Sequence, residues 1–290
     1  MSSELEFARP KDLNETLSML AEAGRTQRII AGGTDIIPGL RQGAKRFEKI
    51  EQLVAVDHLR ELNRIVQKRS YVEIGAAVNF SMLSADPLIR SVFPLLAQAA
   101  ERIGSVQIRN RATIAGNLVN NAPCADSAPP LLVYDAGIRI RSLQTETEIP
   151  LSEFLTGPYR TNLTPDQLVT AIRVPMPENG WTGCFYKLGR RRGVAVSRIS
   201  LAILIRKNGG RIESCRFACG AVTPVAIRLS DLEQRCVGEQ ISRDFLRKIS
   251  RNLGDEVLRI TGLRWSGPYK IPVIRQVFYQ LLCELTEGDR

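Results

Sequence analysis

The sequence predicts an α+β protein, and three kinds of pattern lead to this prediction. Apolar residues recur at helical spacing after residue 12, whereas short β-branched runs at 28–31 and 53–56 stop abruptly. Two longer apolar runs meet at Asn208-Gly209-Gly210, a strong signal for a hairpin between antiparallel strands. With 290 residues, 44% of them hydrophobic, the chain is long enough for two or three domains.

The first half of the chain is expected to begin with a helix. Asp12 and Glu15 have the spacing of a capping box, which opens helices. The residues expected on its apolar face are Leu13, Leu17, Leu20 and Ala21. Lys68-Arg69-Ser70 predicts a turn between strands at 62–66 and 71–74. Further helices are expected at about 87–103 and 128–134.

The last third is expected to form a separate unit. Pro175-Met176-Pro177-Glu178-Asn179-Gly180 predicts a linker, because proline and glycine sustain neither a helix nor a central strand. The strands expected beyond it are Cys184–Gly189, Ser197–Arg206 and Arg211–Ala221. The helices expected after them are Ser230–Cys236, Ser242–Asn252 and Pro272–Leu285.

Charge and hydropathy exclude several classes of protein. No apolar run approaches the roughly 20 residues that span a bilayer, and the N-terminal residues lack the features of a secretory signal. We therefore expect a cytoplasmic protein without a membrane partner. The net charge of +10 indicates an anionic partner. Nucleic acid is not expected, because the basic residues are dispersed or lie in short clusters such as Arg190-Arg191-Arg192 without a recognition motif.

The cysteines and the single histidine do not suggest a metal site. Six cysteines form no C-x-x-C pair, so we expect reduced thiols and no metal in this chain. Cys215 and Cys219 share one face of an expected strand and are interpreted as small core residues. His58 follows Asp57 in a turn, where a structural role is expected.

Two short stretches about eighty residues apart carry most of the functional information. They are Ile30-Ala31-Gly32-Gly33-Thr34-Asp35-Ile36 and Arg109-Asn110-Arg111-Ala112-Thr113-Ile114-Ala115-Gly116-Asn117-Leu118. In each, an apolar run stops at small residues, so the backbone can adopt a positive φ and present bare N–H groups to an anion. A single Gly-Gly is usually only a tight turn, but two such loops together could enclose a pyrophosphate.

Other segments complete a recognisable pattern with these loops. They are Phe7-Ala8-Arg9-Pro10, Val56-Asp57, Ile74-Gly75-Ala76, Ser105-Val106-Gln107-Ile108, Pro123-Cys124-Ala125-Asp126-Ser127-Ala128-Pro129-Pro130-Leu131-Leu132, Phe185-Tyr186-Lys187 and Gly220-Ala221-Val222-Thr223-Pro224. The pattern resembles the FAD-binding subunits of the molybdenum hydroxylases, the family of the xanthine dehydrogenase and carbon monoxide dehydrogenase medium subunits. The segment at 123–132 is most similar to the xanthine dehydrogenase branch.

The resemblance implies a fold and a cofactor site. It implies an FAD-binding domain at 1–177 with two α/β subdomains, about 1–58 and 59–177, of the PCMH/vanillyl-alcohol-oxidase-like type. It also implies a C-terminal domain at 178–290 with an antiparallel sheet and helices, as in carbon monoxide dehydrogenase flavoprotein. The residues that it places against FAD are Ile30, Ala31, Gly32, Gly33, Thr34, Asp35 and Ile36 in the first loop, Thr113, Ala115, Gly116 and Asn117 in the second, and Val119, Asp126, Leu163 and Lys187 beyond them.

Two departures from the family pattern concern this site. Ala115 stands where the pattern usually has glycine, and Arg190-Arg191-Arg192 stands where eukaryotic members place acidic residues near the flavin. One subgroup of the family, similar to 4-hydroxybenzoyl-CoA reductase, carries a cysteine-rich insertion, and this sequence contains nothing comparable. The resemblance implies no catalytic acid or base on this chain.

The function implied by the resemblance is electron transfer in a heterotrimer. A molybdopterin-containing large subunit would hydroxylate the substrate, a [2Fe–2S] small subunit would carry the electrons, and FAD on this chain would pass them to NAD or another acceptor. Purine metabolism is expected from the xanthine dehydrogenase branch. Two alternatives remain: a stand-alone FAD-dependent reductase of related fold, similar to UDP-N-acetylenolpyruvoylglucosamine reductase, and a non-enzymatic basic docking module.

Overall fold

The computed structural model describes residues 5–22, 24–191 and 193–287, which form two compact units. Unit 1 comprises Met1–Asp86, Ile103–Asn121 and Asp135–Met176. Unit 2 comprises Pro87–Arg102, Ala122–Tyr134 and Pro177–Arg290. Two segments from the first 177 positions therefore pack with the C-terminal third. Arg192 and residues 1–4, which entered the sequence analysis, lie outside the described residues.

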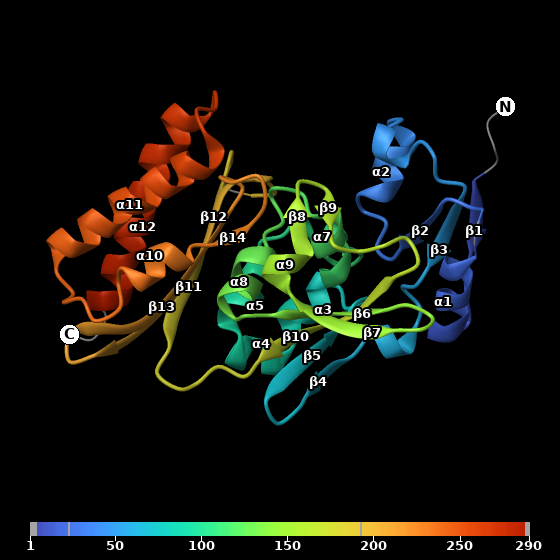
Figure 1. Ribbon diagram of the computed structural model, residues 1–290, viewed down its shortest axis with the longest axis horizontal. Coiled ribbons are helices and arrows are strands. Elements are labelled where there is room, and N and C mark those ends of the chain that lie inside the picture. Colours follow the sequence, from blue (N-terminus) through green and yellow to red (C-terminus); the bar gives the residue numbers. More distant parts are fainter. Residues whose placement is uncertain (1–4, 23, 192, 288–290) are drawn as a thin grey trace. The chain divides into compact units, whose positions relative to one another are not determined.

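The first sheet of unit 1 is parallel and has the order β1-β3-β2. Its strands are β1 (Glu6–Ala8), β2 (Gln27–Ile30) and β3 (Gln52–Ala55). Helix α1 (Leu13–Ala21) connects β1 to β2, and α2 (Ile36–Arg41) follows β2 (Figure 1). Apolar residues of α2 pack against Ile30, Leu53 and Ala55 of this sheet. This packing fixes α2 beside the end of β2, where the first glycine loop lies.

The expected capping box of α1 is confirmed only in part: Asp12 is the N-cap, but the Glu15 carboxylate accepts from the Lys11 N–H at 2.7 Å and not from the N–H of Asp12. The Glu15 N–H donates to Asp12 Oδ1 at 2.8 Å, and Leu13, Leu17 and Leu20 are buried. The expectation for Ala21 is wrong, because Ala21 is exposed in the last turn. Thr16 is buried instead, and its hydroxyl donates to the Asp12 carbonyl at 2.8 Å, which satisfies its polar group.

The second sheet of unit 1 is antiparallel and has the order β4-β5-β10-β6-β7. Its strands are β4 (Ile65–Gln67), β5 (Tyr71–Gly75), β6 (Gly137–Arg141), β7 (Glu146–Pro150) and β10 (Leu168–Pro175). A separate hairpin consists of β8 (Leu155–Gly157) and β9 (Arg160–Thr161). The short helices of this unit are α3 (Phe80–Ala85), α6 (Val106–Arg109), α7 (Ile114–Asn120), α9 (Leu151–Phe154), η1 (Lys45–Phe47) and η2 (Arg60–Leu62).

Unit 2 is built on a four-stranded antiparallel sheet of order β11-β12-β13-β14 (Figure 1). Its strands are β11 (Thr182–Gly189), β12 (Ser197–Asn208), β13 (Arg211–Gly220) and β14 (Ile227–Arg228). The hairpin expected at Asn208-Gly209-Gly210 is confirmed. Asn208 pairs with Arg211, and both glycines have positive φ, +56° and +75°. These are the conformations that the tight hairpin turn requires.

Helices cover both faces of this sheet. They are α4 (Pro87–Val92), α5 (Pro94–Glu101), α8 (Ala128–Val133), α10 (Ser230–Gln234), α11 (Arg243–Thr261) and α12 (Gly267–Glu287). Ile199, Leu201 and Ile203 of β12 share one core with Leu253 of α11 and Phe278 of α12. Helices α5 and α8 also pack on strands of this sheet. The α+β fold class is thus confirmed.

Three helices differ from the sequence-based expectation. Helix α12 begins at Gly267 and not at the expected Pro272, which lies inside the helix. The helix expected at 87–103 is split, because Pro94 starts α5 and the preceding Phe93 is not helical. Proline has no N–H and disfavours the α conformation of the residue before it. Helix α11 continues beyond the expected end at Asn252 to Thr261, since Leu253 and Val257 extend its buried face. In the described part of the chain, no helix is both long and apolar enough to cross a membrane.

Candidate functional site

The first glycine loop joins β2 to α2 within unit 1. Ile30 is buried at the end of β2, and Gly33 has a φ of +70°, a conformation that favours glycine. Residues 31–34 are half-buried, whereas Asp35 is exposed. The N–H groups of residues 33–35 donate to no acceptor within the described residues. Such a row of backbone donors suits the oxygens of an anion.

The two glycine loops meet at Gly32. A Cβ built on Gly32 would overlap the carbonyl oxygen of Arg111 and would lie 2.9 Å from Ala112 Cα. The φ of Gly32 is not positive, so its backbone conformation does not itself require glycine. Glycine is required here because the two backbones approach closely. Arg111 Nη2 lies 3.5 Å from Asp57 Oδ2, in the turn after β3. The sequence-predicted loops are thus brought together by a contact between their backbones.

The second glycine loop is the start of a helix. Thr113 is the N-cap of α7, and its Oγ1 accepts a hydrogen bond from the Gly116 N–H at 3.1 Å. Three neighbouring N–H groups also donate to carbonyl oxygens of unit 1, and they belong to Ile114, Ala115 and Asn117. The expectation that both loops present bare N–H groups is therefore wrong for the second loop. Its N–H groups hold the helix in place.

Ala115 and Gly116 both have a negative φ, as expected in a helix. Ala115 is buried and its Cβ is accommodated, which removes the steric objection to alanine at this position. Gly116 is exposed, and a Cβ added there would meet only Thr113 Oγ1, at 2.8 Å. The expected positive φ is confirmed at Gly33 and wrong at Gly116.

Val119 and Leu163 lie half-buried in unit 1, and an unpredicted residue connects their segments. Asn121 ends α7 with a φ of +43° and is 1% exposed. Its Nδ2 donates to the carbonyl oxygens of Gly157 at 2.8 Å and Arg160 at 2.9 Å. These bonds fasten the β8–β9 hairpin, which leads to Leu163, onto the end of α7. An asparagine just past a helix is the sequence signal for this left-handed cap.

Arg46 is a second residue that sequence reasoning missed. Its guanidinium carbon lies 4.5 Å from the ring centroids of both Phe47 and Tyr159. Its Nη1 donates to Asn120 Oδ1 at 2.8 Å. Arg46 thus links the segment after α2 to α7 and to the β8–β9 hairpin. No sequence signal indicates this role, because Asn120 and Tyr159 are distant in the chain.

Asp126 and Lys187 form a buried ion pair within unit 2. Lys187 Nζ lies 2.7 Å from Asp126 Oδ2 and donates to the Arg102 carbonyl at 2.8 Å. Ser197 donates to the other carboxylate oxygen, Asp126 Oδ1, at 2.5 Å. The two charged side chains are only 5% and 8% exposed. Burial raises the pKa of Asp126, and Lys187 and Ser197 oppose that shift.

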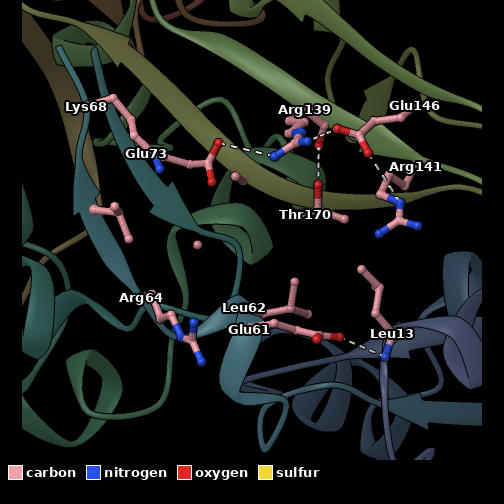
Figure 2. A pocket seen from close by; sticks show the side chains of 13 residues that line it. Leu13, Glu61, Leu62, Arg64, Lys68, Glu73, Arg139, Arg141, Glu146 and Thr170 are labelled. Carbon is pink, nitrogen blue, oxygen red and sulfur yellow. Dashed lines mark hydrogen bonds and ion pairs between the residues drawn. The ribbon is translucent and has the colours of Figure 1, made fainter. Parts of the chain in front are cut away.

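A separate pocket of about 430 Å³ lies in unit 1, over one face of the second sheet (Figure 2). None of the predicted site residues lines it. The charged side chains in it include Arg139, which forms ion pairs with Glu73 and Glu146, and Arg141, which pairs with Glu146. Figure 2 shows these residues along the strands, and Glu61 beside Leu13. Glu61 accepts a hydrogen bond from the Leu13 N–H at 2.8 Å. The carboxylates of the pocket are therefore engaged in interactions within the unit.

The chemistry of unit 1 fits a dinucleotide at the first loop. The fit rests on the bare N–H groups at 33–35, the Thr34 hydroxyl beside them and the glycine contact that holds the second loop against the first. Among the residues that the structure describes, no three histidine, cysteine or acidic side chains lie together as metal ligands would.

Two family models together span most of the chain. The FAD binding domain in molybdopterin dehydrogenase matches residues 3–177, and the CO dehydrogenase flavoprotein C-terminal domain matches residues 184–285. The chain belongs to the FAD-binding medium subunits of the molybdenum hydroxylases. It is accordingly an oxidoreductase subunit, and its cofactor is FAD.

Individual members of the family confirm its extent along the chain. The xanthine dehydrogenase FAD-binding subunit of Escherichia coli O157:H7 is 29% identical over 280 residues, 96% of this chain and 94% of the relative. The glyceraldehyde dehydrogenase medium chain of Sulfolobus acidocaldarius is 28% identical over 94% of this chain and 95% of its own. A solved carbon monoxide dehydrogenase of Hydrogenophaga pseudoflava superposes with a TM-score of 0.89 at 26% identity, covering 99% of both chains.

Proposed function

We propose that this chain is the electron-transfer subunit of a xanthine dehydrogenase-like complex, with a molybdopterin-containing large subunit and a [2Fe–2S] small subunit as partners and NAD as the electron acceptor. The observation that carries the proposal is the first glycine loop, whose bare N–H groups at 33–35 lie beside the backbone of the second loop. It is supported by the family and by the resemblance of residues 123–132 to the xanthine dehydrogenase branch.

The residues of unit 1 supply binding and orientation. FAD, when bound, supplies the redox chemistry, since it can accept electrons from one-electron carriers and release them as hydride. The N–H groups at 33–35 and the Thr34 hydroxyl would hold its diphosphate, each charge-assisted bond contributing roughly 1.5–3 kcal/mol. Thr113 fixes the start of α7 and so positions Asn117 and Val119 on the same helix. Gly32 keeps the two loops in contact.

The roles of the other predicted residues are less direct. Asp126 and Lys187 already satisfy each other within unit 2, so any contact of theirs with FAD would be made by an ion pair rather than by a free charge. Leu163 follows the hairpin that Asn121 holds, and its apolar side chain suits the flavin ring. This chain would hold no substrate-oxidising group of its own, because neither molybdenum ligands nor cluster cysteines are predicted for it.

The proposal is tested with the isolated chain and with the assembled complex. The purified chain should carry FAD but oxidise no purine, aldehyde or N-heterocycle by itself. Addition of the two partner subunits should restore NAD reduction with xanthine, and a preference for an aldehyde over xanthine would contradict the purine assignment. Turnover of any of these substrates by the isolated chain would contradict the electron-transfer role.

A variant in the site separates flavin-dependent from flavin-independent electron flow. Asn117→Leu should impair NAD reduction by the complex far more than reduction of a dye that takes electrons directly from the clusters. The reason is that the substitution acts on flavin binding and leaves the molybdenum subunit unchanged. Equal loss of both activities, with clusters and molybdenum intact, would contradict the assignment.

A further inference from the structure

A cluster of apolar and basic side chains lies exposed at one end of unit 2. Leu263 is 96% exposed and Trp265 is 86% exposed, both in the short turn between α11 and α12. Tyr269, in the first turn of α12, is 46% exposed. The turn lies at the end of the helix pair opposite the C-terminus (Figure 1). Single exposed apolar residues are common, but three large ones at one helix junction are typical of an interaction site.

Three basic residues belong to the same region: Arg198 contacts Tyr269, and Arg264 and Lys270 adjoin the apolar residues in the sequence. The Arg198 guanidinium carbon, at the start of β12, lies 5.2 Å from the Tyr269 ring centroid. Lys270 donates from Nζ to the Ala221 carbonyl at 2.7 Å. Arg264 is exposed and stands between Leu263 and Trp265 in the same turn. Burial, with Arg198 and Arg264 as positive neighbours, lowers the pKa of Lys270. We call these six residues, Leu263, Trp265, Tyr269, Arg198, Arg264 and Lys270, the Trp265 surface.

The Trp265 surface has positive charge that its own unit leaves unneutralised. In the described part of the chain, Arg198, Arg264 and Lys270 take part in no ion pair. The nearby Arg259 differs, because it pairs with Glu256. Three cations with no carboxylate among them repel one another, so an anionic partner would relieve a cost already present in the free chain. The complementary surface must therefore be acidic, with an apolar centre to cover Leu263 and Trp265.

The fixed positions of two of these cations favour a protein partner over a lipid surface. Arg198 is stacked on Tyr269, and Lys270 is hydrogen-bonded to a backbone carbonyl. A membrane attracts basic side chains without requiring such placement, whereas a protein interface uses fixed arginine and aromatic residues as its main binding contacts. Trp, Tyr and Arg are also the residue types enriched at the centre of protein interfaces.

We propose that the Trp265 surface docks the iron–sulfur subunit of the complex. This inference rests on the proposed function, because it assumes that such a subunit delivers electrons to this chain. Clusters of the [2Fe–2S] type are held by cysteine thiolates, which give the subunit that carries them a local negative charge. That charge complements the cations of the Trp265 surface, and the net charge of +10 on the whole chain would speed the encounter.

The experiment measures binding of the full-length FAD-loaded chain to the isolated iron–sulfur subunit by biolayer interferometry. Two variants remove different parts of the surface: Leu263→Ser with Trp265→Ser, and Arg264→Glu. The matched controls are Val237→Ser, at another exposed apolar residue of unit 2, and Lys248→Glu, on the exposed side of α11. All these side chains are exposed, so the variants should fold and keep their flavin.

Each surface variant should bind at least tenfold more weakly, and the controls should stay within twofold of the unchanged chain. The Arg264→Glu variant should also show a weaker dependence of affinity on salt. Unchanged binding by both surface variants would overturn the proposal. The proposal would also be overturned if the surface variants lost only binding to the molybdenum subunit, only self-association of this chain, or only binding to vesicles that contain anionic phosphatidylglycerol. Failure of the unchanged chain to bind any iron–sulfur subunit would instead contradict the proposed function.

Discussion

Gly32 and the Arg111 carbonyl are in such close backbone contact that any side chain at position 32 would force one of the two backbones to shift. The first glycine loop and the segment that leads into the second are separated by about eighty residues in the sequence, yet a single added carbon at Gly32 would overlap the Arg111 backbone. The obstacle is a carbonyl and not the end of a flexible side chain, so it cannot turn aside. This contact sets the separation of the two loops that are proposed to hold FAD.

Gly32→Ala should therefore push the loops apart and reduce flavin binding. Overpacking of this kind costs about 1–3 kcal/mol of stability, and we expect a folded protein that purifies with little flavin. The measurement is the ratio of flavin absorbance to protein, together with thermal unfolding followed by circular dichroism. Gly267→Ala is the control, because nothing lies within 4 Å of a Cβ at that position and its φ is not positive. Full flavin content in Gly32→Ala would show that the contact is not required.

The Asp126–Lys187 ion pair predicts that the stability of the Lys187→Met variant depends on pH, whereas that of the double variant Lys187→Met with Asp126→Asn does not show this dependence. Lys187→Met removes the cation that opposes the effect of burial, so the pKa of Asp126 should rise further above its value in the unfolded chain. A carboxyl with a raised pKa in the folded state retains its proton there while the unfolded chain loses it, so stability falls as the pH rises. An unpaired buried charge at neutral pH costs about 3–5 kcal/mol.

Urea unfolding of Lys187→Met between about pH 5 and 8 tests this linkage. Stability should decrease across that interval relative to the unchanged chain. The double variant Lys187→Met with Asp126→Asn should lose the extra pH dependence, because no titrating group remains in the pair. A double variant that keeps the same slope would assign the effect to another group.

Three cysteines of unit 2, Cys184, Cys215 and Cys219, should be inert in the folded protein. Burial, with Glu284 nearby, raises the pKa of Cys184 to about 12, and burial raises the pKa of Cys219 to about 12. A hydrogen bond with Cys236, together with burial, raises the pKa of Cys215. Since the thiolate is the reactive form, these three should not react with a disulfide reagent at pH 8, roughly half a unit below the usual thiol pKa. Labelling before and after denaturation, read by mass spectrometry, checks each cysteine separately.

Local contacts were predictable from the sequence, and distant ones were not. The N-cap at Asp12 and the hairpin at Asn208-Gly209-Gly210 depend on residues a few positions apart, and both are confirmed. The break at Pro94 follows from the chemistry of proline, although the sequence-based expectation was one helix at about 87–103. The resemblance to a family predicted the cofactor FAD, but it did not predict the hydrogen bonds that hold the two loops and the β8–β9 hairpin.

The second glycine loop shows where pattern alone misleads. Its glycine and alanine look like those of the first loop, yet its N–H groups are bound by Thr113 and by carbonyl oxygens that come from another segment. The partners of Arg46 and Asn121 are also distant in the chain, so no local spacing reveals them. Gly33 is needed for its positive φ, whereas Gly32 is needed because another backbone approaches it closely. These two roles depend on neighbouring residues that only the fold brings together, so the sequence does not distinguish them.

The last prediction concerns the cap that holds the β8–β9 hairpin. Asn121→Gly keeps the left-handed backbone but loses both hydrogen bonds to Gly157 and Arg160, which leaves two carbonyl oxygens without their donor. Each buried carbonyl oxygen left without its donor costs about 1–3 kcal/mol. Because the hairpin leads to Leu163, we also expect weaker retention of FAD on dilution. Flavin fluorescence after gel filtration and urea unfolding measure the two effects.

Asn121→Asp gives the sharper comparison, since it preserves the shape of the side chain and reverses its hydrogen bonding. An ionised carboxylate would face the Gly157 and Arg160 carbonyl oxygens in a site that is 1% exposed, whereas the protonated acid can still donate to one of them. The folded state therefore favours the proton, and this variant should lose stability as the pH rises above the ordinary Asp pKa of about 4. Asn121→Gly has no group that titrates at this position and should show no such trend. If both variants lose the same stability at every pH, the two Nδ2 hydrogen bonds do not hold the hairpin.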